Sequence, residues 1–371
     1  MRRRGDYGSD YSGFTRGGSD RLTTIRLERR RWRGGDDRQV IGRYSQDYGA
    51  KHDFSSPITF GTIPCVSNLN VSERIRQAAE DGDVFAQFEV GVDFDLGTYG
   101  EQNFQKAAEY WAKAANQGHR SAEDNLLLQH VSGQVKTYQS EVVFTRFKNR
   151  AESGDRDAQN NLGLCFQFGY GTAQNYGEAA VWFRRSAEGG LATAQFNLGG
   201  LYYNGTGPKK DLAIAIEWYT RAAEQRHELA LLQLGTIYQK GIGVEVNLER
   251  AAVLYLIAYK QGSVRAANHL GFMFRKGLGV AQDNSLAFQL YLESVNLPDT
   301  SCEIAQNLSY RGTANYWLGY MTENGLGTKR DLRAAKRWYV QGAACGQSNC
   351  IEAIARLSNA IPKRRTRKAV N

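Results

Sequence analysis

The stretch NGTGPKKD at 204–211 is the first candidate for chemistry, because two glycines and two lysines in one loop could hold a phosphate group. A catalytic phosphate loop would occur once, whereas this glycine pair recurs, and the P-loop form G-x-x-x-x-G-K-[ST] is absent. The pattern therefore predicts a structural turn in which glycine supplies a positive φ, with Lys209 and Lys210 solvated. The pairs are Gly169/Gly171, Gly205/Gly207, Gly241/Gly243, Gly277/Gly279 and Gly325/Gly327.

The remaining reactive residue types are scattered along the chain. No H-E-x-x-H, C-x-x-C or G-x-S-x-G motif occurs, and the five histidines form no cluster with metal-ligand spacing. His269 is expected to be a polar surface residue, and the five cysteines to be buried or free thiols in a reducing compartment. We therefore expect no catalytic site, no metal and no cofactor.

An internal repeat is the strongest signal in the sequence. A leading Leu-Gly dipeptide places its glycine at 163, 199, 235 and 271, at intervals of 36 residues, and then at 319 after 48 residues. Gly91 lies 72 residues before Gly163, which leaves room for a degenerate unit at about 119–154. We count seven units over about 84–346, and a helix at 347–360 is a candidate cap for the array.

Each unit is predicted to contain two helices. In the first, Ala194, Leu198, Gly199 and Tyr202 show the spacing of one helical face. The second helix should start at an Asn or Asp that caps its free N–H groups, at Asn103, Asn175, Asp211, Asn247, Asp283 and Asp331. Large apolar anchors follow seven residues later, at Tyr110, Trp182, Trp218, Leu254, Leu290 and Trp338.

These marks resemble the Sel-one-like repeat family, a relative of the tetratricopeptide repeat. The shared pattern is A-x-x-x-L-G-x-x-Y-x-x-G-x-G, then Asp or Asn, then W-Y-x-x-A-A-x-x-G. The resemblance covers about residues 84–346. It implies an all-α fold, a right-handed α-solenoid of about seven 36-residue helix-turn-helix repeats. It also implies an adaptor or scaffold in multiprotein complexes, without catalytic residues of its own.

Three features depart from the family pattern. The second unit has lost most of the marks, and Arg226 stands where the family has its closing glycine. Twelve extra residues are inserted around LPDTSCEIAQNLSYRG, where Pro298 should break a helix. The insertion is interpreted as a tolerated loop, with a partner-specific loop or a bend in the solenoid as the alternative.

The charge of +9 is concentrated at the two ends of the chain. Residues 1–50 carry 12 arginines against seven acids, a charge of +5, and residues 362–371 carry another +5, which leaves −1 for the rest. We expect a disordered or extended Arg/Gly/Tyr-rich arm at 1–70, a solenoid at 71–361 and a basic tail at 362–371. The candidate polyanion contacts are Arg29, Arg30, Arg31, Arg33, Lys363, Arg364, Arg365 and Arg367.

The first helices of such solenoids line a binding surface, and aromatic and Arg side chains are enriched at interface hot spots. Positions around each Leu-Gly dipeptide supply the candidates for a partner groove, although any one of them could instead be a core residue. They are Phe196, Tyr203, Phe272, Arg275, Tyr316 and Tyr320.

The sequence favours a non-catalytic protein-interaction scaffold, a structural subunit of a larger assembly. The alternative is a ribonucleoprotein component that binds nucleic acid through its Arg-rich arm, where two RGG triplets and several tyrosines occur. No apolar run reaches 18 residues, so no membrane partner is expected, and we expect an intracellular protein, cytoplasmic or nuclear, with an organelle as an alternative.

Overall fold

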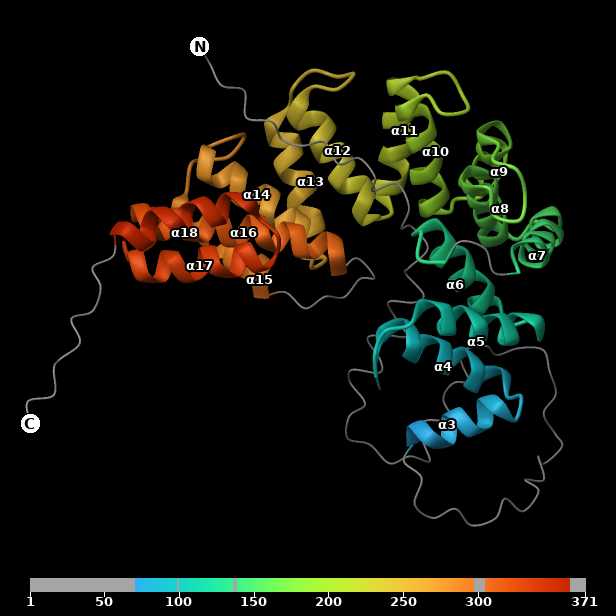
Figure 1. Ribbon diagram of the computed structural model, residues 1–371. Helices are drawn as coiled ribbons and strands as arrows, with labels where there is room; N and C mark the ends of the chain where they lie inside the picture. The colour runs from blue at the N-terminus through green and yellow to red at the C-terminus, as the bar shows by residue number, and fades with distance from the viewer. Residues whose placement is uncertain (1–70, 99, 136–138, 297–303, 361–371) are drawn as a thin grey trace, which may run out of the picture. The chain divides into compact units, whose positions relative to one another are not determined.

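The computed structural model describes residues 71–98, 100–135, 139–296 and 304–360, and all regular secondary structure in these ranges is helical (Figure 1). Seven helix pairs follow one another, each with a first and a second helix. They are α4 Val84–Leu96 with α5 Phe104–Asn116, α6 Arg120–Val131 with α7 Ser140–Glu152, α8 Arg156–Phe168 with α9 Tyr176–Glu188, α10 Ala192–Asn204 with α11 Leu212–Glu224, α12 Glu228–Lys240 with α13 Leu248–Lys260, α14 Val264–Lys276 with α15 Asn284–Asn296, and α16 Ile304–Asn324 with α17 Leu332–Ala344.

Single helices flank the seven pairs. Helix α3, Val71–Glu80, packs on α4, and α18, Ser348–Ala360, packs on α17. The predicted helix at the C-terminal end of the repeats is therefore confirmed. So is the degenerate second unit, since α6 and α7 occupy the place that the spacing reserved for it.

All six predicted N-caps are confirmed by side-chain hydrogen bonds to the backbone of the second helices. In α11, for example, Asp211 Oδ1 accepts the N–H of Ile214 at 3.0 Å. The turn before it also follows the prediction, because Gly205 ends α10 with φ of 75° and donates its N–H to the carbonyl of Leu201. NGTGPKKD is thus a helix–helix connection. The other caps are Asn103, Asn175, Asn247, Asp283 and Asp331.

The glycine of each leading Leu-Gly dipeptide lies against an aromatic ring of the second helix. A Cβ atom at Gly235 would come within 2.5 Å of the Tyr255 ring, and one at Gly199 within 2.9 Å of the Tyr219 ring. These rings are fully buried, and each follows a predicted anchor by one residue. Three of the predicted anchors, Trp182, Trp218 and Leu290, are buried as well, but spacing alone does not show that the next residue is the one that faces the glycine. The rings are Trp111, Phe183, Tyr219, Tyr255, Tyr291 and Tyr339.

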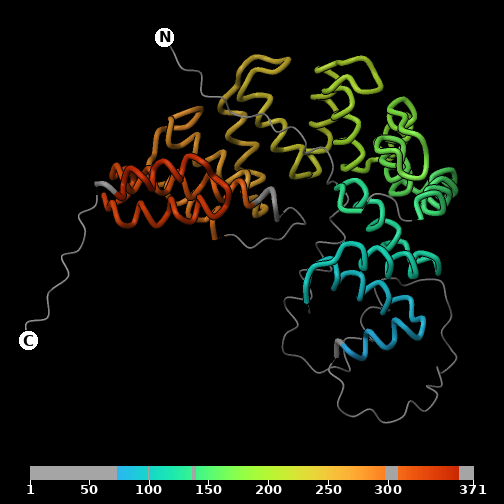
Figure 2. Tube along the Cα trace, viewed as in Figure 1, coloured from blue at the N-terminus to red at the C-terminus, as the bar shows by residue number. Residues whose placement is uncertain are grey.

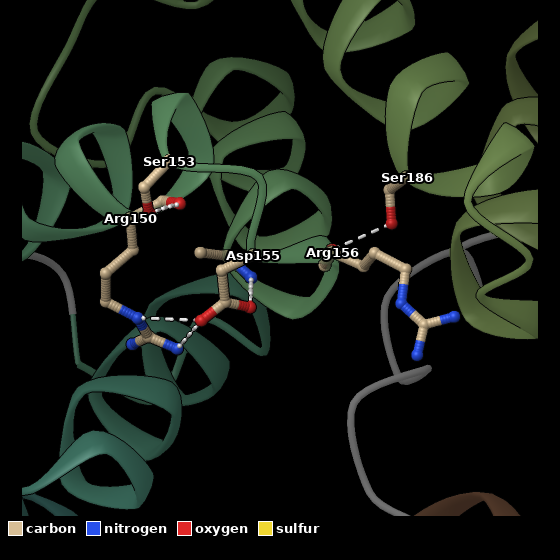
Figure 3. A network of polar contacts seen from close by, with 6 residues as sticks. Arg150, Ser153, Asp155, Arg156 and Ser186 are labelled. Atoms are coloured by element: carbon tan, nitrogen blue, oxygen red, sulfur yellow. Dashed lines mark hydrogen bonds and ion pairs between the residues drawn. The ribbon is translucent and has the colours of Figure 1, made fainter.

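An ion pair orders the connection between α7 and α8, where the repeat signature is weak (Figure 3). Arg150 at the end of α7 donates from Nε and Nη2 to Asp155 Oδ2, at 3.1 and 2.9 Å. The other oxygen of Asp155 accepts the N–H of Ala158 at 3.1 Å and so caps α8. Ser186 of α9 then donates to the carbonyl of Arg156 at 2.8 Å. One carboxylate therefore both closes the turn and starts the next helix.

The predicted insertion is helical in part. Helix α15 ends at Asn296, two residues before Pro298, as predicted, and residues 297–303 lie outside the described ranges. Helix α16 is 21 residues long, whereas α14 has 13, and the extra residues precede its Leu-Gly dipeptide. The interpretation as a loop is therefore corrected, because about two additional helical turns extend α16 at its N-terminal end.

Two compact units divide the chain, residues 1–147 with 168–174 and residues 148–167 with 175–371. The tube trace in Figure 2 follows the paired helices α10 to α17 and the single helix α18 within the second unit. Among the described residues, no helix is both long enough and apolar enough to cross a membrane.

Candidate protein-interaction surface

The six predicted groove residues all lie on first helices of the second compact unit. Phe196 and Tyr203 belong to α10, Phe272 and Arg275 to α14, and Tyr316 and Tyr320 to α16. The predicted polyanion contacts in the N-terminal arm and the C-terminal tail lie outside the described residues, so their role stays a prediction.

The two candidates on α10 separate into a core residue and a partly exposed one. Phe196 is 7% exposed, and its ring centroid lies 5.5 Å from that of Tyr219 and 5.1 Å from that of His227. This packing makes Phe196 a core residue rather than an outward-facing one. Tyr203 is partly buried beside Tyr219, with the Lys210 ammonium 5.9 Å from its ring centroid.

The four candidates on α14 and α16 meet around a residue that the sequence reasoning missed, Trp317. The guanidinium carbon of Arg275 lies 3.8 Å from the centroid of a Trp317 ring and 5.6 Å from the Phe272 centroid. Tyr316 and Tyr320 meet Trp317 edge-on, with centroids 5.1 and 5.7 Å away. We call Phe272, Arg275, Tyr316, Trp317 and Tyr320 the Trp317 cluster. Its four aromatic side chains are all partly buried.

A signal for Trp317 was present in the sequence. It stands two residues before the Leu-Gly glycine, where the neighbouring units carry Asn197, Gln233 and His269. A large aromatic residue at a position otherwise held by polar or ionisable side chains marks a local change of function or packing. Part of Trp317 and Tyr320 also packs on the buried core that contains Tyr291 and Leu318. The cluster is therefore anchored in the fold and only partly available to a partner.

Arg275 is the most unusual member of the Trp317 cluster. It is 8% exposed, yet no described residue accepts a hydrogen bond from its guanidinium, and its Nε atom is fully buried without a partner. Arginine stays charged at any physiological pH, and burying a charge without a counter-ion is costly. Stacking on a desolvated aromatic face contributes about 2 kcal/mol or more, which offsets part of that cost.

The carboxylate of α16 is already engaged elsewhere. Glu323 Oε2 accepts the hydroxyl of Tyr339 at 2.9 Å and pairs with Arg356 of α18 at 2.7 Å. Burial, together with this hydrogen bond to a carboxylate, raises the pKa of Tyr339. Glu323 therefore ties α16 to α17 and α18.

His269 is not the polar surface residue that we expected. It is partly buried and stacks on Tyr255, with ring centroids 4.5 Å apart and an interplanar angle of 5°. Burial first, and then the positive charges of Lys240 and Arg265, lower the pKa of His269 to about 4. The imidazole is neutral at pH 7 and serves as a flat packing surface.

The other reactive groups have structural roles. His119 and His227 accept backbone N–H groups of Ala122 and Ala230 and so cap α6 and α12, roles that the sequence reasoning missed. The three cysteines within the described ranges are free thiols, and burial raises the pKa of Cys350 to about 11. Within these ranges, no group of three His, Cys, Asp or Glu residues could hold a metal ion.

The Sel1 repeat matches at residues 84–119, 156–191, 192–227, 229–263, 264–299 and 312–347, which is more than half of the chain. The chain belongs to the Sel1 repeat family. Six of the seven helix pairs are matched, and the degenerate pair α6–α7 is not. Sel1 repeats generally mediate protein–protein interaction.

Two solved structures are similar to this Sel1 repeat protein. The first is c5321 of uropathogenic Escherichia coli, described as a protective antigen displaying an SLR fold, at 31% identity and a TM-score of 0.55. The match covers 80% of this chain and 62% of that one. The second, a Sel1 repeat protein from Oxalobacter formigenes, is 28% identical with a TM-score of 0.54, over 62% of this chain and 89% of that one. A search of curated proteins gave no match.

Proposed function

We propose that this protein is a non-catalytic adaptor, a structural subunit that holds protein partners within a larger assembly. The Trp317 cluster carries the proposal, because four partly exposed aromatic side chains and one arginine gather on two adjacent first helices. Tyr, Trp and Arg are the residues that most often dominate binding energy at protein interfaces.

The repeat has constant positions that pack its helices and variable positions that could contact a partner, and this difference supports the proposal. The positions that build the helix pairs, the Leu-Gly glycine and its aromatic partner, recur in six units. The positions around the Leu-Gly dipeptide on the first helices differ from unit to unit, and α14 and α16 together bring four aromatic side chains and Arg275 to one place. In a repeat protein, such local differences on one face are how a partner is recognised.

An affinity purification from the native source tests the proposal. The purified material is divided, and one half is treated with nuclease before the bound proteins are identified by mass spectrometry. We expect the same bound proteins in both halves. Loss of these proteins from the treated half would contradict a direct protein scaffold and favour the ribonucleoprotein alternative, which rests on the arginine-rich arm.

A matched pair of variants connects that result to the Trp317 cluster. The double variant Phe272→Ala/Tyr320→Ala removes two of its rings, whereas Val253→Ala removes an exposed side chain (55% exposed) from the second helix α13. We expect the double variant to lose the partners that Val253→Ala retains, with circular dichroism confirming the fold. Equal retention by both variants would remove the Trp317 cluster from the proposal. If the double variant does not fold, Phe272→Ala alone provides the test.

A further inference from the structure

Arg275 has no counter-ion within the described part of the chain, although its surroundings are well ordered for binding one. Its Nε atom is buried without a partner, no described residue accepts a hydrogen bond from its two Nη atoms, and the residue as a whole is 8% exposed. The guanidinium carbon lies 3.8 Å from the centroid of a Trp317 ring, and this contact restricts the movement of the side chain. A planar, immobilised guanidinium with free Nη groups is suited to bind a carboxylate through two parallel hydrogen bonds.

The carboxylates on the neighbouring helices do not pair with Arg275. Helices α14, α15 and α16 contain two acidic residues, Glu293 and Glu323. Glu293 accepts the hydroxyl of Tyr259, and Glu323 is held by Tyr339 and Arg356. Asp283, in the connection between α14 and α15, caps α15 through the N–H of Leu286. Each of these acids has a partner other than Arg275.

The same region carries an excess of positive charge. Helix α14 contributes Arg265, Arg275 and Lys276 and has no acidic residue, and Arg311 lies on α16. Lys240 of α12 is close enough, with Arg265, to act on His269. A segment that approaches the first helices here therefore meets cations next to partly exposed aromatic rings.

We propose that the Trp317 cluster binds an acidic segment of a partner protein, with one carboxylate side chain on Arg275 and apolar side chains on Phe272 and Tyr320. The inference rests on the proposed adaptor function and names the chemistry of the partner. Charge complementarity carries the choice, since an anion is the group that Arg275 lacks. Helix α10 has no charged residue, so a phosphate backbone running along the first helices would lose its contacts there.

A labelled peptide tests this chemistry directly. Full-length protein is titrated into fluorescein-labelled ELEELE, and into QLQQLQ as the uncharged control, with fluorescence anisotropy measured at near-physiological salt to weaken contacts with the basic ends. We expect binding of the acidic peptide and weaker binding of the amide peptide. Equal affinities for the two peptides would overturn the proposal.

Two arginine variants of equal net charge locate the site. Arg275→Gln should weaken binding of ELEELE roughly tenfold or more, because the carboxylate loses its hydrogen-bonding partner. Arg221→Gln is the matched control, since Arg221 also stacks on a tryptophan, Trp218 at 4.5 Å, but already pairs with Glu217 at 2.6 Å. It should bind as the unaltered protein does. No loss in Arg275→Gln, or the same loss in both variants, would contradict the assignment.

A second variant and a nucleic-acid competitor complete the peptide-binding experiment. Arg275→Lys retains the charge but not the planar donor pair, so we expect a severalfold loss of affinity for ELEELE. This variant replaces Arg275→Gln if circular dichroism shows that Arg275→Gln is unfolded. Unchanged affinity would overturn the proposal. Unlabelled single-stranded DNA of 12 nucleotides should not displace the peptide. Displacement that depends on Arg275 would assign the site to nucleic acid instead.

The capture experiment separates the two proposals. Partners that are retained by both the unaltered protein and Arg275→Gln would leave the adaptor function standing and refute the acidic-segment inference. Absence of protein partners even with the unaltered chain would refute the adaptor function itself.

Discussion

The contacts between successive first helices change in kind along the second compact unit. Between α8 and α10, the amide of Asn197 donates to the side-chain oxygen of Asn160 at 2.9 Å, and both residues are buried. Between α14 and α16, Arg275 lies on Trp317, and its donors are left without acceptors. In the first contact the amide donor has an acceptor within the protein, whereas in the second the guanidinium donors remain available to another molecule.

The second helices show no such change. Tyr219, Tyr255, Tyr291 and Tyr339 are each buried against the glycine of the first helix, in regular and irregular units alike. The glycine and its aromatic partner recur in six of the seven units. The packing of second helix on first helix is therefore regular, whereas the contacts between successive first helices differ from unit to unit.

The largest effect should follow loss of a buried tyrosine. Tyr255→Ala is expected to lower the free energy of unfolding by about 3–5 kcal/mol, because a fully buried ring leaves a cavity. Tyr291→Ala, in the α14–α15 pair, should cost a similar amount. Denaturant titration followed by circular dichroism measures both. A cost below about 1 kcal/mol for either variant would contradict a packing position that is equivalent across units.

Gly235→Ala tests the same packing from the other side. Its new Cβ would come within 2.5 Å of the Tyr255 ring, so we expect a loss of about 1–3 kcal/mol from overpacking. The sign of the change in stability is informative, since Gly→Ala inside an unhindered helix stabilises the protein by about 1 kcal/mol. Gly177→Ala in α9 is the matched control, because its Cβ meets only the side-chain oxygen of Asn175, at 3.2 Å. Thermal melts should show a clearly larger loss of stability for Gly235→Ala than for Gly177→Ala.

Arg226→Gly should raise stability. Arg226 has φ of 61°, whereas Gly190 and Gly262 close the neighbouring turns at 89° and 88°. A left-handed conformation costs a non-glycine residue about 1–2 kcal/mol, and the greater freedom of glycine in the unfolded chain cancels part of that. We expect a net gain of about 0.5–1 kcal/mol. A destabilised variant would show that the Arg226 side chain contributes more than its backbone strain costs.

The smallest effect should come from the partly exposed imidazole of His269. Its pKa is lowered to about 4 in the folded protein from an ordinary value of 6.5, so between these values the unfolded chain binds the proton more readily. Its contribution is therefore complete above pH 6.5 and is lost as the pH falls toward 4. His269→Gln, which introduces the residue found at Gln233 in the preceding unit, should flatten the dependence of the melting temperature on pH in that window. An unchanged profile would show that other groups cause any loss of stability there.

Much of the fold could be predicted from the sequence because the repeat multiplies every local signal. The spacing of 36 residues, the Asn and Asp caps and the glycine turns fixed seven helix pairs, including a pair with almost no signature. Caps and turns depend on residues within a few positions of one another, so sequence reasoning handles them well. The same reasoning proposed four of the five residues in the Trp317 cluster.

Tertiary structure decided what each helix face contacts. Spacing could not show that Phe196 points into the core, or that Tyr255 rather than Leu254 fills the space above Gly235, because adjacent residues on a helix differ only in direction. Nor could it show that Arg275 would lie on Trp317, which is 42 residues away, with its donors unpaired. The sequence by itself determined the repeat, its boundaries and its family. Which side chains are left available to a partner was decided by the packing between units. That packing joins residues that lie far apart in the sequence.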